Sequence, residues 1–208
     1  MKKRLANFLI RLILIADDKY KITLLNLLKS EEFLKRKTKY FERYSISPDF
    51  KINGKQTYFF GEGEIIIGSN NYIGDYSTIQ AVKNCKVEIG KNCAISHNVK
   101  IYTSSYITNQ NFDIEEELDV KSGNVIIGNG VWIGANVLIN PNVKIGDNAV
   151  VGANSVVIKD IEKNTINSGI PAIKIKNKMI VWFFEIALLL AAKLKAILSI
   201  NIYVLVKW

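Results

Sequence analysis

The chain contains a single histidine, His97, the residue type that most readily exchanges a proton near neutral pH. A histidine can take a proton from a hydroxyl group, and a nearby carboxylate can orient the imidazole. Asp75 is the candidate carboxylate, because Ile73-Gly-Asp75 and Ile95-Ser-His97 are equivalent segments of a repeat. These two side chains would supply acid–base chemistry. A zinc centre of three histidines is excluded, and we expect no metal.

A six-residue spacing of aliphatic residues must position these side chains. Six residues turn an α-helix by about 600°, so the aliphatic residues would not form one stripe. The spacing suits a short strand and a corner, three of which close one coil of a β-helix. A β-sandwich is the alternative, but it needs no constant step of six. The twelve positions form four groups of three, which predict about four coils: Ile67, Ile73, Ile79, Ile89, Ile95, Ile101, Ile127, Ile133, Ile139, Ile145, Val151 and Val157.

The stacking of coils predicts which side chains become neighbours. If Ile73, Ile95 and Ile133 share one side of the coil, the residues two places later form a column. Adjacent coils lie about 4.8 Å apart, so Asp75 would lie directly beneath His97. We therefore predict an Asp75–His97 dyad. The alternative is that His97 is a corner residue bonded to the backbone.

The repeat divides the chain into three parts. Residues 62–176 form the predicted β-helix, residues 1–61 a helical N-terminal extension and cap, and residues 177–208 an apolar C-terminal tail that we expect to be helical. A long insertion, residues 107–124, interrupts the repeat. Long insertions leave a solenoid stack and often carry function.

The net charge of the chain and the segments on either side of the repeat indicate which binding partners to expect. The net charge is +9, which favours anionic partners, but no basic run interleaved with aromatic residues indicates nucleic-acid binding. Cys85 and Cys93 give no disulfide framework, so we expect a cytoplasmic protein. The basic N-terminal helices would pack against the β-helix or a neighbouring subunit, or lie on an anionic membrane surface. The tail is interrupted by charged residues and would cap the coil, enter an oligomer interface or lie in a membrane surface.

Two sequence segments, together with the repeat, resemble those of a known protein family. Val131-Trp-Ile-Gly-Ala-Asn-Val137 and Gly169-Ile-Pro-Ala172, together with the repeat, resemble the hexapeptide-repeat acyltransferases, in the branch of sugar and antibiotic O-acetyltransferases. The resemblance implies a left-handed parallel β-helix, a homotrimer and transfer of an acetyl group from acetyl-CoA. Acetyl transfer to a hydroxyl requires a base and hydrogen-bond donors for the developing oxyanion.

The resemblance also implies site residues. The family base is a histidine five residues after the aliphatic residue that precedes the large loop, and this chain has Tyr106 there, in Ile101-Tyr-Thr-Ser-Ser-Tyr106. We therefore assign the base to His97, with Asp75 as its partner. Tyr106 would bind the acceptor or donate to the oxyanion, or else support the loop as a surface aromatic.

For the acyl donor, Trp132 is expected beside the acceptor or the thioester, although it could instead pack on a neighbouring subunit. Gly134 and Gly152 would allow close approach of the pantetheine arm. Lys159 and Lys174 would lie near the phosphates of CoA. The expected function is acetyl-CoA-dependent O-acetylation of a sugar hydroxyl in surface polysaccharide synthesis. The alternatives are an N-acetyltransferase acting on an amino sugar or nucleotide sugar, and a non-catalytic hexapeptide-repeat scaffold.

Overall fold

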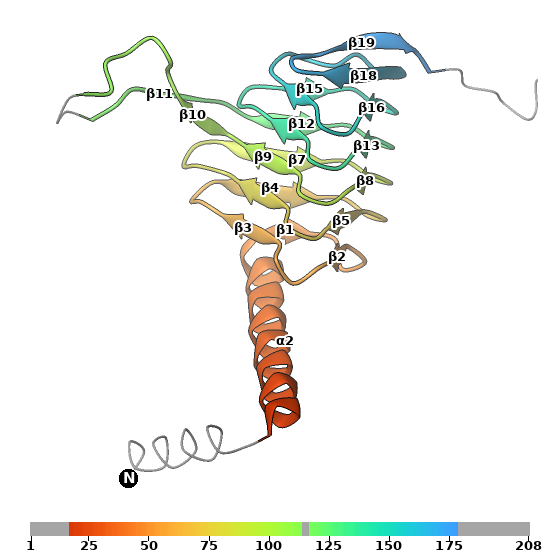
Figure 1. The fold of residues 1–208 in the computed structure, drawn as a ribbon. Helices are drawn as coiled ribbons and strands as arrows, with labels where there is room; N and C mark the ends of the chain where they lie inside the picture. The colour runs from red at the N-terminus through yellow and green to blue at the C-terminus, as the bar shows by residue number, and fades with distance from the viewer. Residues whose placement is uncertain (1–16, 114–116, 179–208) are drawn as a thin grey trace, which may run out of the picture. The chain divides into compact units, whose positions relative to one another are not determined.

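The computed structural model describes residues 17–113 and 117–178, which form a parallel β-helix preceded by one long helix (Figure 1). Each coil contributes one strand to each of three faces, here called A, B and C. Strands of successive coils pair in parallel, as in β4–β7, β5–β8 and β6–β9. The predicted β-helix is confirmed.

In each face, the strands stack in the order in which they occur in the chain. Face A contains β1 (Ser45–Ile46), β4 (Glu64–Ile67), β7 (Lys86–Ile89), β12 (Val125–Ile127) and β15 (Lys144–Ile145). Face B contains β2 (Lys51–Asn53), β5 (Tyr72–Gly74), β8 (Ala94–Ile95), β13 (Trp132–Ile133), β16 (Val150–Val151), β18 (Thr165–Gly169) and β19 (Ala172–Asn177). Face C contains β3 (Tyr58–Phe60), β6 (Thr78–Gln80), β9 (Lys100–Tyr102), β14 (Leu138–Ile139) and β17 (Val156–Val157).

The aliphatic residues of the six-residue repeat fill the interior of the coil. All twelve are 0–2% exposed. Ile73, Ile95, Ile133 and Val151 are consecutive register partners on face B. Each coil therefore stacks aliphatic side chains on those of the next coil, and this continuous core replaces the contacts that a single coil could not make.

The stack begins earlier than the predicted boundary at residue 62. Strands β1, β2 and β3 form a first coil, so the described residues form five complete coils where the sequence predicted about four, and face B continues with β18 and β19. Ile46, Ile52 and Phe59 are the register partners of Ile67, Ile73 and Ile79. Phe59 is aromatic and follows Ile52 by seven residues, so this coil departs from the aliphatic step of six.

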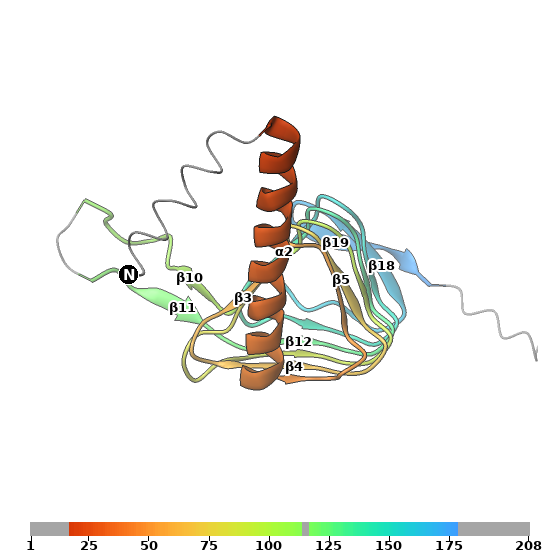
Figure 2. The same cartoon turned by 90° about the horizontal axis from the view of Figure 1, so that it is seen from below.

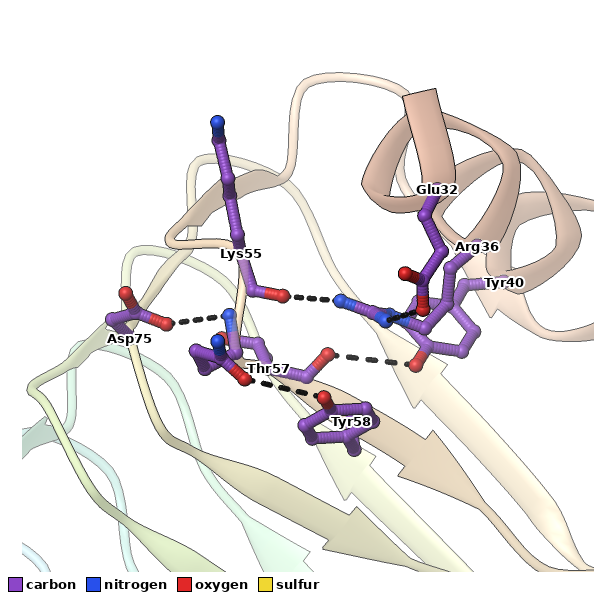
Figure 3. Close-up of polar contacts among 8 residues, drawn as sticks. Glu32, Arg36, Tyr40, Lys55, Thr57, Tyr58 and Asp75 are labelled. Carbon is purple, nitrogen blue, oxygen red and sulfur yellow. Dashed lines mark hydrogen bonds and ion pairs between the residues drawn. The ribbon is translucent and has the colours of Figure 1, made fainter. Parts of the chain in front are cut away.

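The long helix α2 (Asp18–Arg43) closes the open end of the first coil (Figure 2). Its sequence is rich in Leu, Lys and Glu and contains no Gly or Pro, which favours a helix. Tyr40 stacks on Phe59 with ring centroids 4.7 Å apart. The guanidinium group of Arg36 lies 4.5 Å from the centre of the Tyr58 ring, and both residues are drawn in Figure 3. Packing against the β-helix, one of the two predicted roles, is thus observed for the C-terminal half of α2.

The N-terminal half of α2 keeps apolar side chains at the surface. Ile22, Leu27 and Leu28 are more than half exposed. No helix of the described residues is long and apolar enough to cross a membrane. The predicted helical stripe in residues 1–16 and the apolar tail from residue 179 lie outside the described residues.

The predicted insertion leaves the stack as a hairpin. Strand β10 (Ser104–Tyr106) follows β9 directly and pairs in antiparallel fashion with β11 (Val120–Ser122). Tyr106 and Val120 are the last paired residues before the loop. Thr103 and Gly123 close the base, where the backbone N–H of Gly123 donates to the carbonyl of Thr103 at 2.9 Å. The hairpin therefore projects from the edge between faces C and A (Figure 1).

Candidate functional site

His97 and Asp75 lie in adjacent coils at the edge between faces B and C. The backbone N–H of Asp75 donates to Nδ1 of His97 at 3.0 Å. The backbone N–H of Asn98 donates to the Asp75 carbonyl at 2.8 Å, and that of Asn136 donates to the His97 carbonyl at 3.0 Å. The predicted column of Asp75 beneath His97 is therefore present.

The predicted contact between the Asp75 carboxylate and the imidazole is not formed. The carboxylate turns toward the first coil, where Oδ1 accepts a hydrogen bond from the backbone N–H of Gln56 at 2.7 Å (Figure 3). Oδ1 also accepts from the backbone N–H of Tyr76, the next residue in its own coil, at 2.9 Å. It shapes the corner rather than orienting the histidine. The sequence places the two residues in one column but does not show that corner N–H groups compete for the carboxylate.

The contact to Nδ1 determines what His97 can do. A nitrogen that accepts a hydrogen bond carries no proton, so the neutral imidazole holds its proton on Nε2. In this tautomer His97 is a hydrogen-bond donor to a ligand, since a base would need a free lone pair on Nε2. The backbone-bonded reading of His97 is thus observed. The exposed ring leaves Nε2–H available at the surface.

Tyr76, which follows Asp75 in the chain, departs from the regular corner. It adopts a left-handed backbone with φ of 61°, a conformation that costs free energy for a bulky residue. The equivalent corner residues in later coils are Asn98, Asn136 and Asn154, whose side chains form a ladder of hydrogen bonds 2.9 Å long. The ammonium group of Lys100 donates to the Tyr76 carbonyl at 2.5 Å, and burial lowers its pKa.

A second group of residues surrounds a cleft at the edge between faces C and A. The cleft has a volume of about 400 Å³, which is within the usual range for small-molecule sites. Its walls come from the hairpin and from the corners of the two following coils. The lining residues are Ser105, Tyr106, Ile107, Thr108, Lys121, Asn140, Pro141 and Ile158.

The surroundings of Tyr106 are compatible with two of its predicted roles. Its ring meets that of Phe112 edge-on with centroids 6.2 Å apart, so it supports the hairpin loop. It is also 58% exposed and lines the cleft, so its hydroxyl can meet a ligand. Sequence reasoning did not single out Lys121 or Asn140, because the lining depends on how the hairpin folds back over the next coils.

The predicted CoA-binding residues differ in their surroundings. Lys159 is exposed and directly follows Ile158 of the cleft. Lys174 instead donates to Glu162 at 2.7 Å, and this hydrogen bond lowers the pKa of the Glu162 carboxyl. A phosphate at Lys174 would have to compete with that exposed pair.

Gly134 and Gly152 have a packing reason to be glycine. A Cβ at Gly134 would lie 2.5 Å from the backbone nitrogen of Ala153, and one at Gly152 would lie 2.7 Å from Oγ of Ser168. Both missing Cβ atoms would therefore point at the next stretch of chain in the stack. Close stacking of the coils is therefore a sufficient reason for glycine at both positions.

The chain thus has two separate groups of candidate residues. His97, Asp75 and Tyr76 lie at the edge between faces B and C, whereas Tyr106 and Lys159 lie at the edge between faces C and A. Strand β9 runs between the two edges, and each of its residues advances the chain by about 3.3 Å. Trp132 stands on the outside of face B and is 55% exposed.

Comparison with known proteins agrees with this architecture. Residues 124–159 match the family described as bacterial transferase hexapeptide (six repeats). No curated protein matches the chain. Among solved structures, a maltose O-acetyltransferase from Clostridium difficile 630 is 28% identical with a TM-score of 0.58, and the match covers 78% of this chain and 86% of that chain.

Two further solved structures resemble the chain. AntD, an N-acyltransferase from Bacillus cereus in complex with dTDP-4-amino-4,6-dideoxyglucose and coenzyme A, is 26% identical with a TM-score of 0.54, over 73% of this chain and 87% of that chain. A hexapeptide-repeat acetyltransferase from Vibrio cholerae is 23% identical with a TM-score of 0.57, over 79% of this chain and 96% of that chain, which shows the shared fold.

Proposed function

From the hexapeptide repeats and the match of residues 124–159 to bacterial transferases, we propose that the chain transfers an acetyl group from acetyl-CoA to a hydroxyl group of a sugar. The expected context is the synthesis of a surface polysaccharide. The reaction forms an ester bond to the sugar oxygen, breaks the thioester, and passes the hydroxyl proton to the released thiol.

The observation that carries the proposal is the cleft beneath the hairpin. Tyr106 and Lys121 line it, and Lys159 stands beside it. The cleft can take a small acyl group with part of its carrier, and the two lysines complement the negative charge of CoA phosphates. The solved relatives from Bacillus cereus hold coenzyme A or an acyl-CoA, which supports a CoA-linked donor.

Within this proposal the described residues have separate tasks. Tyr106 offers a phenolic hydroxyl that can donate to the developing oxyanion of the thioester. His97, with its proton on Nε2, donates to the acceptor and orients it. Asp75 holds His97 in this tautomer through its backbone N–H rather than through its carboxylate.

The separation of Tyr106 from His97 supports an oligomeric enzyme. We propose a homotrimer in which the C–A edge of one copy meets the B–C edge of the next, so that each site uses Tyr106 from one chain and His97 from another. Such a site would combine groups that a single chain holds at opposite ends of β9.

This arrangement can be tested by mixing variants. His97→Ala and Tyr106→Ala, each of low activity alone, are unfolded and refolded together, and CoA release from acetyl-CoA is measured with sugar acceptors. Mixed trimers contain some sites with neither substitution, so activity should recover to a sizeable fraction of wild type. Absence of recovery, with mixed trimers shown by mass spectrometry, would contradict the shared site.

An N-acyltransferase is the second candidate, favoured by the similarity to the Bacillus cereus enzyme that binds an amino sugar nucleotide. Parallel assays with hydroxyl and amino acceptors separate the two. A chain that binds no CoA and releases none with any acceptor would instead be a non-catalytic scaffold.

We also propose that the protein works in the cytoplasm at the inner face of the membrane. Exposed Leu27 and Leu28 on α2, a helix rich in lysine, are the supporting observation. Sedimentation with vesicles containing anionic lipid, compared with vesicles of neutral lipid, tests this. Equal and negligible binding to both would argue against it.

A further inference from the structure

The outside of face B carries two exposed aromatic side chains with a small residue between them. Strands β5, β8 and β13 are neighbours on face B (Figure 1). Tyr72 pairs with Ala94 in register, and Ala94 pairs with Trp132, so the three residues form one column on the outside of the coil. Tyr72 is 39% exposed and Trp132 is 55% exposed. The middle coil therefore contributes only a methyl group between two rings.

The spacing of the coils sets the width of this slot. Two steps between paired strands separate the backbones of Tyr72 and Trp132 by about 9.6 Å. A ring held between two aromatic faces needs about 3.5–4.0 Å on each side for van der Waals contact. The slot is thus wide enough for one ring between Tyr72 and Trp132, and the Ala94 methyl group would form its floor.

Toward the B–C edge, the coil that contains Ala94 carries a directed hydrogen-bond donor. His97 follows Ala94 by three residues in the same coil, at the B–C edge. Its Nδ1 accepts from the backbone of Asp75, so Nε2–H is the group left for a ligand. An apolar slot with one polar group toward the B–C edge is suited to a ligand that has both a stacking face and hydroxyl groups.

We propose that Tyr72 and Trp132 form a binding slot for one pyranose ring of the acceptor, with Nε2–H of His97 donating to an oxygen of that ring. The faces of aromatic rings carry partial negative charge, and the C–H bonds on one face of a pyranose present partial positive charge to them. This inference rests on the proposed function for the class of the acceptor. It adds Tyr72 and Ala94 as residues that determine acceptor binding.

The decisive variant is Ala94→Leu, which fills the floor of the slot and leaves both walls in place. Ala153→Leu is the matched control, because Ala153 is an exposed alanine at the B–C edge outside the slot. In steady-state assays with maltose and glucosamine as acceptors, Ala94→Leu should raise the acceptor KM at least tenfold and change the acetyl-CoA KM less than twofold. Tyr72→Ala should act in the same direction, and the control should match wild type.

A binding measurement separates this inference from the proposed activity. In a chain carrying Trp182→Phe and Trp208→Phe, Trp132 is the remaining tryptophan. Its fluorescence should change on titration with maltose or glucosamine, and Ala94→Leu should abolish the change. If no acceptor is acetylated but the Trp132 fluorescence still changes with the sugar, the binding slot is supported and the proposed acetyl transfer is contradicted.

Three outcomes would contradict the proposal that Tyr72 and Trp132 bind a pyranose ring. The first is turnover with an acceptor KM that Ala94→Leu leaves unchanged. The second is a Trp132 response to CoA that neither sugar produces. The third is a shift of Ala94→Leu to a smaller oligomer in sedimentation analysis, which would identify this face as a contact between copies of the chain.

Discussion

The edge between faces B and C and the edge between faces C and A lie at opposite ends of the same strands, yet they are built differently. At the B–C edge, the corners that follow β5, β8, β13 and β16 have equal length, and Asn98, Asn136 and Asn154 form a continuous hydrogen-bonded ladder. At the C–A edge, the hairpin of β10 and β11 interrupts the stack and encloses a cleft. The difference shows that a solenoid can keep one edge regular for stability while another edge varies.

The regular B–C edge contains one irregular residue, Tyr76. Tyr76 occupies the place of an asparagine, breaks the ladder below Asn98, and adopts a left-handed backbone that disfavours aromatic residues. It follows Asp75, whose backbone N–H donates to His97, the donor of the proposed site. Local strain of this kind often marks functional positions, and here it coincides with the single histidine of the chain.

The largest expected effect on activity comes from removing the loop of the hairpin at the C–A edge. Replacing residues 107–119 by Asn-Gly would join Tyr106 to Val120 through a two-residue turn and keep the pairing of β10 with β11. Because Ile107 and Thr108 wall the cleft, CoA release should fall by about 100-fold through lost positioning. The unfolding temperature should change by only a few degrees, since the hairpin lies outside the core.

Phe112→Ala in the full-length loop is the control for this prediction. It removes the ring contact to Tyr106 and leaves the loop length unchanged, so its effect on activity should be smaller. Full activity of the shortened chain in a CoA-release assay would show that the irregular edge is not the reaction site.

At the regular edge, Gly134→Ala tests close stacking against cofactor contact. The added Cβ would lie 2.5 Å from the nitrogen of Ala153, so the coils must shift, and the free energy of unfolding should fall by about 1–3 kcal/mol. Acetyl-CoA affinity at low temperature should stay the same. Denaturant unfolding and calorimetric titration measure the two quantities, and a variant that loses affinity at unchanged stability would restore the cofactor role.

A smaller effect of opposite sign is expected at Tyr76. Tyr76→Asn would place a residue that tolerates the left-handed backbone beneath Asn98 and allow the ladder to extend by one coil. The free energy of unfolding should rise by about 1 kcal/mol. Asn136→Tyr introduces the opposite change and should destabilise the protein. Thermal unfolding of the two variants distinguishes them, and equal melting temperatures would contradict the account of the ladder.

The smallest effect is expected for Asp75→Asn. The amide oxygen of asparagine can accept the same hydrogen bonds from Gln56 and Tyr76, and the backbone N–H that donates to His97 is unaffected. Turnover and its pH profile should therefore remain within about twofold of wild type. A pH profile displaced by more than a few tenths of a unit would revive the carboxylate–imidazole dyad.

The sequence by itself determined the repeat, its three-sided coil, the inward positions from Ile67 to Val157, and the place of the hairpin. It could do so because a solenoid is a nearly one-dimensional stack, in which spacing along the chain sets the contacts between neighbours. The column of Asp75 and His97 followed from the same spacing. Tyr76 could also have been found in this way, since it alone replaces asparagine in the corner ladder below Asn98.

Only the tertiary structure decided which atoms of these neighbours meet. It showed that the backbone of Asp75, not its carboxylate, bonds to His97, because the carboxylate finds closer donors at the corner. It also showed that Tyr106 and His97 lie at opposite edges of face C. It also gave Gly134 a stacking role, since the direction of a missing Cβ depends on the path of the next coil. Side-chain hydrogen bonds and the lining of a cleft depend on directions in space, which spacing along the chain does not specify.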